Sequence, residues 1–522
     1  MNVLFWFKYI ATFSRIVLLS IYTYAKARLF GKKKCTAPLL LNRDSHIAIV
    51  GGGIGGVGAA YALVRSGYKN VTIYEAREKL GGNARTHVWK INNKNKNITT
   101  GLSVLAWPEV FRNYIHLLNA LNIETTTVEL PFFIHNRDEN TFFAHAKQDV
   151  HTQQYNTDLT RWRRMIDIVR YISELFHDRE TSLYHFSLLN PFNYISMRLL
   201  SLLFGISTRF WNNIVVPMYA TTFLSTNLSF IPSAILPTVD RLISLDPNRI
   251  PTLQAWLQTS TDVFDRMTQG TTIRTKSPVK SVRIQRNQQN QIMICINNED
   301  VIYDRIIFAC DSESTLNALK NGNTNISLLL KIMLSNVTYS GDDDANLLDG
   351  IIHRDISILP NEFADEVTRK YANYIDVKYD KKKQIFYNYN TFILSSWLPN
   401  VHAMLKENNL EQSEIEPMLV TYSPYDQPAP QIDKKKIYGT VDNRRAHPSL
   451  SLRNQAISLL MRLVQGENGM YFCGCSATPA NGHDLSLISG FAVAELIGAA
   501  YPFADNLYAL RDYNRFKRMC ID

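Results

Sequence analysis

The clearest hydrophobic pattern in the chain is a short apolar run followed by glycines and then by a helical run. Residues 46–50 (His-Ile-Ala-Ile-Val) are typical of a buried strand, and residues 59–64 (Ala-Ala-Tyr-Ala-Leu-Val) favour a helix. Residues 51–58 between them hold six glycines. A second strand is predicted over residues 70–74, so this region has the strand–helix–strand order of a βαβ unit.

The region 131–260 is predicted to be largely helical. Apolar residues recur there at helical spacing while arginines occupy the other face; these are Trp162, Met165, Ile166, Val169, Ile172 and Phe176, against Arg161, Arg163, Arg164 and Arg170. Residues 197–204 are more continuously apolar. Two interpretations stay open: core helices with a solvated basic face, or a lid that docks on a membrane and admits an acyl chain. Residues 507–518 predict another basic amphipathic helix with the same ambiguity.

Residues 3–30 form a long apolar segment that is interrupted by Lys8 and Arg15. The segment is long enough to cross a bilayer, for which about 20 apolar residues suffice. We expect a membrane anchor or interfacial helix; a cleaved signal peptide and a buried N-terminal helix are the alternatives, and the lysines at 32–34 are unfavourable for export. The basic residues that follow the segment outweigh those within it, which predicts that the next domain lies in the cytoplasm.

Composition narrows the class of protein. The 522 residues are 46% hydrophobic and 20% charged, which excludes a wholly disordered chain, and glycine and proline follow no fibrous repeat. A mean hydropathy of -0.15 excludes a polytopic membrane protein. The net charge of +10 is spread along the chain, so it fits an anionic membrane surface or an acidic substrate at least as well as nucleic acid. We therefore expect no nucleic-acid partner.

Cysteine usage argues against a disulfide scaffold and against a metal. Six cysteines, at positions 35, 295, 310, 473, 475 and 520, are too sparse for such a scaffold and favour a reducing compartment. Cys473, Cys475 and His483 could suggest a metal, but no second ligand pair accompanies them at zinc spacing. We expect no metal site.

The glycine-rich segment is a candidate dinucleotide site because it lies between a strand and a helix. Gly51 permits the tight turn, Gly53 lets the backbone approach a pyrophosphate, and Gly56 allows the helix to pack closely on the strand. Gly55 belongs to the same loop, whose helix N-terminus presents free N–H groups to the phosphates. Glu75 ends the second strand, where its carboxylate is placed to accept hydrogen bonds from a ribose. The alternative is a glycine-rich turn that binds no ligand.

Residues 75–86 resemble the E-A-x-x-x-x-G-G-x-x-x-T segment of the FAD-dependent amine oxidase and phytoene desaturase superfamily. The resemblance implies FAD as the cofactor, with Gly81 and Gly82 against the diphosphate and Arg77 as an arginine that contacts FAD. Asn83 belongs to the same segment and departs from the family, which usually has arginine there.

Three later segments resemble the parts of this family that close the cofactor site. Residues 275–282 are similar to the strand whose valine, here Val279, reads adenine through its backbone. Residues 303–310 resemble the strand that crosses under the cofactor, with Ala309 near its end. Residues 470–490 resemble the segment in which a strand end, here at Gly474, contacts ribitol and a helix faces the flavin pyrimidine. Relatives often carry an acidic residue at the position of Cys475, and the resemblance offers Asp484 as its replacement.

Residues 98–101 match the D-x-G turn that faces the isoalloxazine, which implicates Gly101, although Thr99 replaces the usual aspartate. Residues 353–360 resemble the H-x-D-x-x-L-M-P segment of one subgroup, the FAD-binding proteins encoded beside or fused to cyclopropane-fatty-acid synthases. Further motifs of that subgroup have counterparts at residues 388–390, 422–424, 446–448 and 481–485. Residues 253–257 depart from its pattern.

The expected fold is α/β: a Rossmann-type FAD-binding domain built from discontinuous segments, a mixed α+β substrate domain and an N-terminal apolar helix. The predicted FAD-binding segments are 46–130, 261–325 and 441–500. The other predicted segments are 1–34 (membrane anchor or interfacial helix), 131–260 (helical substrate or lid region), 326–440 (sheet of the substrate domain) and 501–522 (C-terminal amphipathic helix).

His483 is the candidate catalytic residue, because the resemblance places it beside the flavin; a purely structural histidine is the alternative. A flavin that abstracts hydride needs orientation, exclusion of water and one base at most. The leading prediction is an FAD-dependent oxidoreductase that removes hydride from, or isomerises, a hydrophobic lipid-like substrate at a membrane. The alternatives are a flavin amine oxidase that acts on a small amine and releases hydrogen peroxide, and a non-catalytic flavoprotein scaffold. The oligomeric state stays open.

Overall fold

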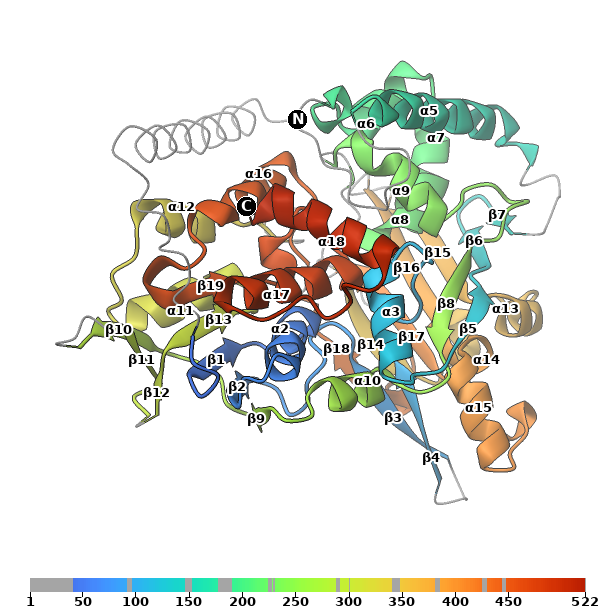
Figure 1. Ribbon diagram of the computed structural model, residues 1–522. Helices are drawn as coiled ribbons and strands as arrows, with labels where there is room; N and C mark the ends of the chain where they lie inside the picture. Colours follow the sequence, from blue (N-terminus) through green and yellow to red (C-terminus); the bar gives the residue numbers. More distant parts are fainter. Residues whose placement is uncertain are drawn as a thin grey trace.

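The computed structural model shows two sheets with helices packed around them and a helical region above the second sheet (Figure 1). It describes residues 41–91, 96–145, 153–176, 190–223, 228, 231–287, 292–299, 301–339, 348–380, 385–424, 430–443 and 447–521. The apolar helix predicted over residues 3–30 lies outside these ranges. Within them, no helix combines the length and the hydropathy that a membrane span needs.

A five-stranded parallel sheet forms the first half of the fold. Its order is β19 (Met470–Phe472), β13 (Arg305–Phe308), β1 (His46–Val50), β2 (Asn70–Tyr74) and β9 (Thr272–Arg274). The strands β9, β13 and β19 thus join β1 and β2 from distant parts of the chain. The central strand β1 is buried from Ile47 to Val50, as expected for a parallel strand that is covered on both faces. The predicted α/β fold with a discontinuous Rossmann-type sheet is confirmed.

The register of this sheet brings three strand ends to one level. Val50, the last residue of β1, pairs with both Tyr74 and Phe308, the last residues of β2 and β13. Immediately beyond them, the Gly51 N–H donates to the Tyr74 carbonyl (2.9 Å) and the Ala309 N–H donates to the Val50 carbonyl (2.8 Å). Open α/β sheets bind ligands outside the carboxyl ends of their strands, so a site is expected at this edge.

Helices cover one face of the parallel sheet. They are α2 (Ile54–Arg65), α17 (His483–Ile497), α3 (Arg112–Ala120), α10 (Ser260–Met267) and α18 (Leu507–Cys520), which share one hydrophobic cluster (Figure 1). The contact of α2 with α17 is very close, since a Cβ at Gly490 would lie 2.1 Å from the Gly55 carbonyl oxygen. On α18, Tyr513 and Phe516 are buried in this cluster, so its apolar face is core.

The other face of the parallel sheet is covered by a small sheet and three helices. The small sheet is antiparallel and consists of β10 (Val282–Arg286), β11 (Ile292–Ile296) and β12 (Ile302–Tyr303). The helices are α11 (Ser312–Asn321), α12 (Leu328–Asn336) and α16 (Leu452–Leu460). Their apolar residues form a second cluster with Ala48 and Val50 of β1, so the central strand has a hydrophobic core on each side.

A mixed sheet of seven strands forms the second half of the fold. Its order is β18 (Ile437–Val441), β14 (Leu348–His353), β17 (Leu419–Pro424), β16 (Ile385–Ile393), β15 (Asn373–Asp380), β6 (Phe132–Asn136) and β7 (Thr141–Ala144). The β15–β6 pair is parallel and the other pairs are antiparallel. Three further helices are α13 (Ala364–Lys370), α14 (Leu394–Trp397) and α15 (Pro399–Glu407).

Two additional antiparallel pairs lie beside the sheets, β3 (Thr86–Ile91) with β4 (Lys96–Gly101) and β5 (Thr125–Glu129) with β8 (Thr252–Trp256). The prediction of a largely helical 131–260 region was wrong for β6, β7 and β8, which lie within it. Every residue of β6 is buried, so its sequence lacks the apolar–polar alternation that distinguishes a strand.

The helical region packs on the seven-stranded sheet. It contains α5 (Asn156–Glu174), α6 (Met197–Leu203), α7 (Thr208–Phe210), a π-helical turn (Trp211–Val215), α8 (Val216–Phe223) and α9 (Leu236–Leu242). Trp162, Met165 and Val169 are buried in a cluster that includes residues of β6 and β15. Most of the predicted apolar stripe on α5 is therefore ordinary core.

The outer side of α5 and α6 nevertheless exposes large apolar side chains. This α5–α6 face consists of residues that are each at least 38% exposed, namely Ile168, Tyr171, Leu175, Phe176, Tyr194, Leu199, Leu202 and Leu203. In Figure 1 the two helices lie together at one end of the molecule.

Candidate functional site

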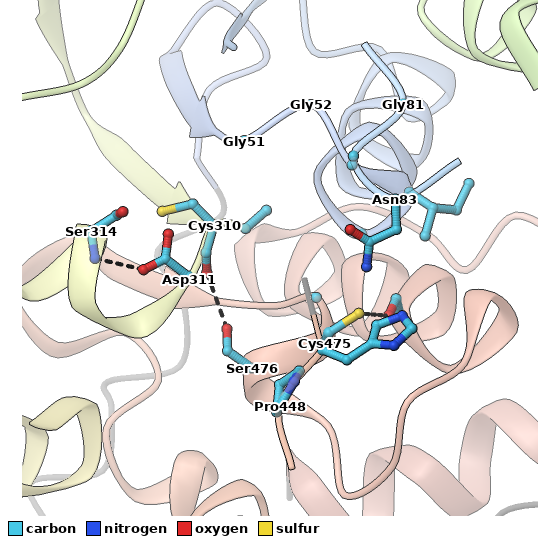
Figure 2. Close-up of a pocket in the computed structure, with 18 of the residues that line it drawn as sticks. Gly51, Gly52, Gly81, Asn83, Cys310, Asp311, Ser314, Pro448, Cys475 and Ser476 are labelled. Carbon is cyan, nitrogen blue, oxygen red and sulfur yellow. Dashed lines mark hydrogen bonds between the residues drawn. The ribbon is translucent and has the colours of Figure 1, made fainter. Parts of the chain in front are cut away.

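A cleft of about 510 Å³ follows the carboxyl-terminal edge of the parallel sheet. Residues 50–55, 74–83, 308–318 and 474–486 supply most of its lining. Figure 2 shows the Gly51–Gly52 turn with Asn83 on one wall, and Cys475 with Pro448 on the opposite wall. The cleft therefore brings together segments that the sequence analysis assigned separately to one cofactor.

The glycine loop is tightly packed on one side and open on the other. Gly51 has a φ of +111°, and a Cβ there would lie 2.8 Å from the Ala309 carbonyl oxygen. A Cβ at Gly56 would lie 2.1 Å from the Gly51 oxygen. A Cβ at Gly53 would meet nothing nearer than the Gly82 Cα at 3.7 Å. Gly53 lines the cleft, so its free side is available to a ligand and the other two positions are required by packing.

Glu75 both holds the loop and faces the cleft. Its Oε2 accepts a hydrogen bond from the Gly52 N–H and its Oε1 accepts one from the Arg77 N–H, each at 2.8 Å. A carboxylate has about four lone-pair sites. Both oxygens therefore keep acceptor capacity for the hydroxyls of a ribose.

Positive charge gathers at the Gly81–Gly82 turn. Arg77 Nη1 donates to the Gly82 carbonyl at 2.9 Å, and Arg85 Nε approaches the same oxygen at 3.4 Å. Burial, together with the charge of Arg77, lowers the pKa of Arg85 to about 10, and the Arg85 Nη2 is buried without a hydrogen-bond partner. Guanidinium groups pair well with phosphates, so this turn is suited to a diphosphate.

Gly474 brings the C-terminal segment against the glycine loop. A Cβ at Gly55 would lie 2.8 Å from the Gly474 Cα, and the Gly474 N–H donates to Ser489 Oγ on α17 at 2.9 Å. Next to it, the Cys475 Sγ lies 3.1 Å from Ser486 Oγ in the wall of the cleft. Burial raises the pKa of the Cys475 thiol. The cleft thus has a neutral thiol where relatives often have a carboxylate.

Three predicted cofactor residues are not among those that line the cleft: Gly56, whose place is fixed by packing, Asp484 and Gly101. Asp484 is fully buried, and its Oδ1 accepts a hydrogen bond from the Tyr114 N–H at 2.6 Å. It joins α17 to α3, so the predicted contact with ribitol is corrected. Gly101 ends β4, and the cleft is lined instead by Ser103 and Val104, which follow it. The remaining predicted residues, Asn83, Val279 and Ala309, do line the cleft.

His483 is the first residue of α17 and lines the cleft. Its ring packs edge-on against Tyr114 at a centroid distance of 4.5 Å, and its Nε2 is buried without a hydrogen-bond partner. Burial lowers the pKa of His483 to about 3, and a helix N-terminus acts in the same direction. The imidazole is neutral at pH 7 and a poor base, because proton transfer is most efficient when the pKa is near the working pH. Its geometry supports orientation of a ligand rather than proton transfer.

Several lining residues were not assigned to the cofactor site from the sequence, although residues 446–448 were among the motifs of the resemblance. His447 lines the cleft with an unpartnered, buried Nδ1, and burial lowers its pKa to about 4. Asp311 accepts a hydrogen bond from the Ser314 N–H at 2.8 Å and caps α11 beside the cleft (Figure 2). An Asp just after a buried strand and directly before a helix-forming run is an N-cap signal that could have located this wall.

The H-x-D segment at residues 353–360 belongs to the interior of the second sheet. His353 is fully buried; its Nε2 lies 2.8 Å from Thr421 Oγ1 and its Nδ1 accepts the Asp355 N–H at 3.1 Å. Asp355 lies 3.2 Å from Lys436 Nζ. These contacts connect β14 to its neighbours, so the resemblance at this segment marks a structural element rather than part of the cleft.

The residues considered for a metal are dispersed. Cys473 is buried in the core, where burial raises the pKa of its thiol, and it does not line the cleft with Cys475 and His483. Across the described ranges, no group of three or more His, Cys, Asp or Glu residues is arranged to hold a metal ion.

Comparison with known proteins assigns the family. A sequence model described as flavin containing amine oxidoreductase matches residues 54–319, half of the chain, and the chain belongs to this family. The tryptophan 2-monooxygenase of Pantoea agglomerans pv. gypsophilae is 32% identical over 81 residues, which are 16% of this chain and 14% of that protein. The polyenoic fatty acid isomerase of Ptilota filicina is 50% identical over 48 residues, 9% of each chain. The matched segments are therefore a small share of these relatives.

Solved structures share the fold over most of both chains. A redesigned putrescine oxidase has a TM-score of 0.57 at 14% identity, and the cyclohexylamine oxidase of Brevibacterium oxydans IH-35A has 0.56 at 12%. A CLA-producing fatty acid isomerase from P. acnes has 0.54 at 12%. In each case the match covers 87% of this chain and 99% of the other. At these identities the likeness concerns the fold alone.

The protein is an FAD-dependent oxidoreductase of this family, with FAD as its cofactor. The residues of the cleft fit the groups of FAD. Gly53 has an open side, Arg77 and Arg85 place positive charge at the Gly82 turn, and His483 offers an unpartnered buried nitrogen. Buried polar atoms rarely stay unpaired in native proteins, so a ligand in the cleft accounts for them.

Proposed function

We propose that this enzyme oxidises, or moves a double bond within, an uncharged apolar segment of its substrate. The observation that carries this proposal is a side pocket of about 100 Å³ next to the cleft. The side pocket shares Phe111, Thr222, Asn481 and Gly482 with the cleft, at the end that also contains His483. A substrate in the side pocket would therefore adjoin the part of the cleft that the family resemblance assigns to the flavin ring.

The chemistry of the side pocket favours an apolar ligand. Ten of its lining residues are Phe111, Phe223, Ala234, Ile235, Val239, Leu242, Leu450, Pro479, Ala480 and Leu485. No lining residue among those described is charged. An ammonium or a carboxylate placed there would lose its hydration without gaining a partner, which costs several kcal/mol. The volume is of the same order as an apolar cavity of about 150 Å³ that holds benzene, so a short apolar segment fits.

The chain contributes orientation and exclusion of water. Bound FAD supplies the capacity to accept a hydride from the substrate. Phe111 presents apolar surface where the two cavities meet and Leu485 adds to the apolar wall of the side pocket, so water would be kept from the reacting carbon. The neutral His483 imidazole can hold a ligand by a hydrogen bond from or to its Nε2, without taking up a proton at neutral pH.

Among the alternatives, a small polar amine is less well suited to this pocket. The solved relatives include a putrescine oxidase and a cyclohexylamine oxidase. In the side pocket of this chain, the described lining has no carboxylate to pair with an ammonium group. A segment of a lipid or another apolar molecule meets no such obstacle.

A pocket-filling variant tests the proposed function. Ala234 is partly buried and lines the side pocket, so Ala234→Phe should fill it and leave the FAD cleft intact. We expect anaerobic reduction of the flavin by an apolar substrate, or formation of conjugated double bonds, to slow by about tenfold or more, which corresponds to about 1.4 kcal/mol. Flavin absorbance should be unchanged. Unsaturated fatty acids and alcohols are the substrate panel, and putrescine is the amine probe.

Ala364→Phe is the matched control, since Ala364 is also partly buried but lies on α13, away from both cavities. Rapid flavin reduction by putrescine that is insensitive to Ala234→Phe would contradict the proposal. It would favour the amine oxidase alternative.

The proposed setting is a lipid surface reached through the α5–α6 face. Its exposed leucines and aromatic residues lie in the same helical region as α8 and α9, which line the side pocket. Arg164 is exposed on α5 and adds positive charge suited to anionic lipid. The predicted anchor at residues 3–30 lies outside the described ranges, and the cytoplasmic location of the catalytic domain stays a prediction.

Flotation with liposomes that contain anionic lipid tests this setting. The full chain should float in high salt, because apolar burial is not screened by ions. Because residues 3–30 are expected to anchor the full chain, the variants are compared in a chain without residues 1–34: there the double variant Leu202→Glu with Leu203→Glu should float less than its parent, and Leu328→Glu, an exposed leucine on α12, should float like that parent. If the parent chain, the double variant and Leu328→Glu floated equally, the α5–α6 face would not be part of the membrane contact.

A further inference from the structure

Gln455 places an unpaired amide in the wall of the side pocket. The residue lies in the middle of α16 and is 7% exposed, and its backbone is held by the helix through a hydrogen bond from its N–H to the Ser451 carbonyl (3.0 Å). Its side-chain Oε1 is buried and has no hydrogen-bond partner. Gln455 is also one of the residues that line the side pocket, together with residues of α9.

An unpaired amide oxygen in this buried position destabilises the protein unless another group pairs with it. A buried acceptor that lacks a partner costs about 1–3 kcal/mol, and native proteins keep such groups where a ligand or ordered water satisfies them. The neighbouring amide of Asn481 is already engaged, since its Nδ2 donates to the Pro448 carbonyl at 2.9 Å. Gln455 therefore differs from Asn481 in having its hydrogen-bonding capacity available to the pocket.

Water is a poor partner for this amide. A buried water needs two to four polar partners, and the side pocket is lined mostly by apolar side chains. An ion is a poor partner as well, because a neutral amide cannot offset the desolvation of a full charge. A hydroxyl group is well suited, since it donates to Oε1 and accepts from the amide NH₂ with the same oxygen atom.

We infer that Gln455 is a specificity-determining residue that binds one neutral hydroxyl group on an otherwise apolar substrate. This inference rests on the proposed function, because it takes the side pocket as the substrate site. The substrate class is then an apolar alcohol or phenol-like molecule whose apolar part packs against α9 while its hydroxyl meets the amide. Molecules of equal size without the hydroxyl leave the amide unpaired and bind less well.

Phenol and toluene form a matched pair of probes, because they differ by a hydroxyl in place of a methyl group. Their dissociation constants are measured by calorimetry on the FAD-loaded wild type, on Gln455→Met and on Thr238→Val, which alters another polar residue of the same pocket. In Gln455→Met the ratio of the two constants should shift towards toluene by about five- to tenfold, the effect of one neutral hydrogen bond. Thr238→Val should leave the ratio near that of the wild type.

Thermal stability without a probe separates recognition from a structural role. Because Oε1 has no partner in the protein, Gln455→Met should have a Tm at least as high as the wild type. A clear fall in Tm in both Gln455→Met and Gln455→Leu, or failure of both to fold, would show that the amide is structural and overturn the inference. An unchanged phenol-to-toluene ratio in a folded Gln455→Met protein would overturn it too. If toluene fails to bind even the wild type, the apolar pocket itself, and with it the proposed function, is refuted.

Discussion

Gly53→Asp should give a folded protein that has lost its FAD. A Cβ at this position meets no protein atom nearer than 3.7 Å, so the fold can accept the side chain. The new carboxylate would stand in the cleft where the resemblance places the pyrophosphate, and like charges in contact cost several kcal/mol. We expect a loss of affinity for FAD of about 100-fold or more, measured as absent flavin absorbance in purified protein with unchanged circular dichroism.

Gly53→Ala is the matched control for this variant. It adds the same Cβ without the charge, so it should retain more FAD than the aspartate variant. A Gly53→Asp protein that keeps one FAD per chain would show that the diphosphate does not lie against Gly53.

Gly56→Val should prevent the protein from folding. A Cβ at Gly56 would lie 2.1 Å from the Gly51 oxygen, 3.0 Å from the Ala309 Cβ and 3.1 Å from Ile49 Cγ2. The first of these is a backbone atom, and Gly51 is held in place by the hydrogen bond from its N–H to the Tyr74 carbonyl (2.9 Å). Overpacking of a core typically costs 1–3 kcal/mol, and we expect about 3 kcal/mol or more here since backbone must move. Soluble yield and Tm measure the effect.

Gly439→Ala serves as the control for added volume. Its Cβ would have its nearest neighbour, Ile352 Cδ1, at an ordinary 3.5 Å, so we expect little change in Tm. If Gly56→Val folded with the Tm of the wild type, the close contact between α2 and the glycine loop would not be required. Together, the variants at Gly53 and Gly56 separate the loss of cofactor from the loss of fold within one loop.

The local sequence was sufficient to predict those features that depend on a few consecutive residues. The strand, glycine loop and helix predicted over residues 46–64 are present as β1 and α2, and the strand over 70–74 is present as β2. A glycine in such a pattern indicates a tight turn or a close contact of the backbone with another group. The direction of the carboxylate at the end of β2 is set by that strand. These features need no knowledge of distant contacts.

Residues whose direction depends on packing were harder to assign. Asp484 follows the Gly482 turn at the start of α17, yet its carboxylate accepts a hydrogen bond from the Tyr114 N–H of α3. His483, its neighbour, does line the cleft, but burial makes it a poor base. A one-residue step along a helix turns a side chain by about 100°, so adjacent positions can face a cofactor and a core.

From the sequence alone, local glycine, strand and helix patterns predicted a Rossmann-type βαβ unit, and the resemblance of several segments to the FAD-dependent amine oxidase superfamily implied FAD as the cofactor. The tertiary structure decided which residues complete the site. It joined residues 309 and 474 to the glycine loop, directed Asp484 away from the cleft, and placed Gln455 of α16 beside α9 in an apolar side pocket. Such contacts form between segments hundreds of residues apart. The hydrophobic periodicity of a segment shows which of its faces is buried, but it does not show which other segment packs against that face.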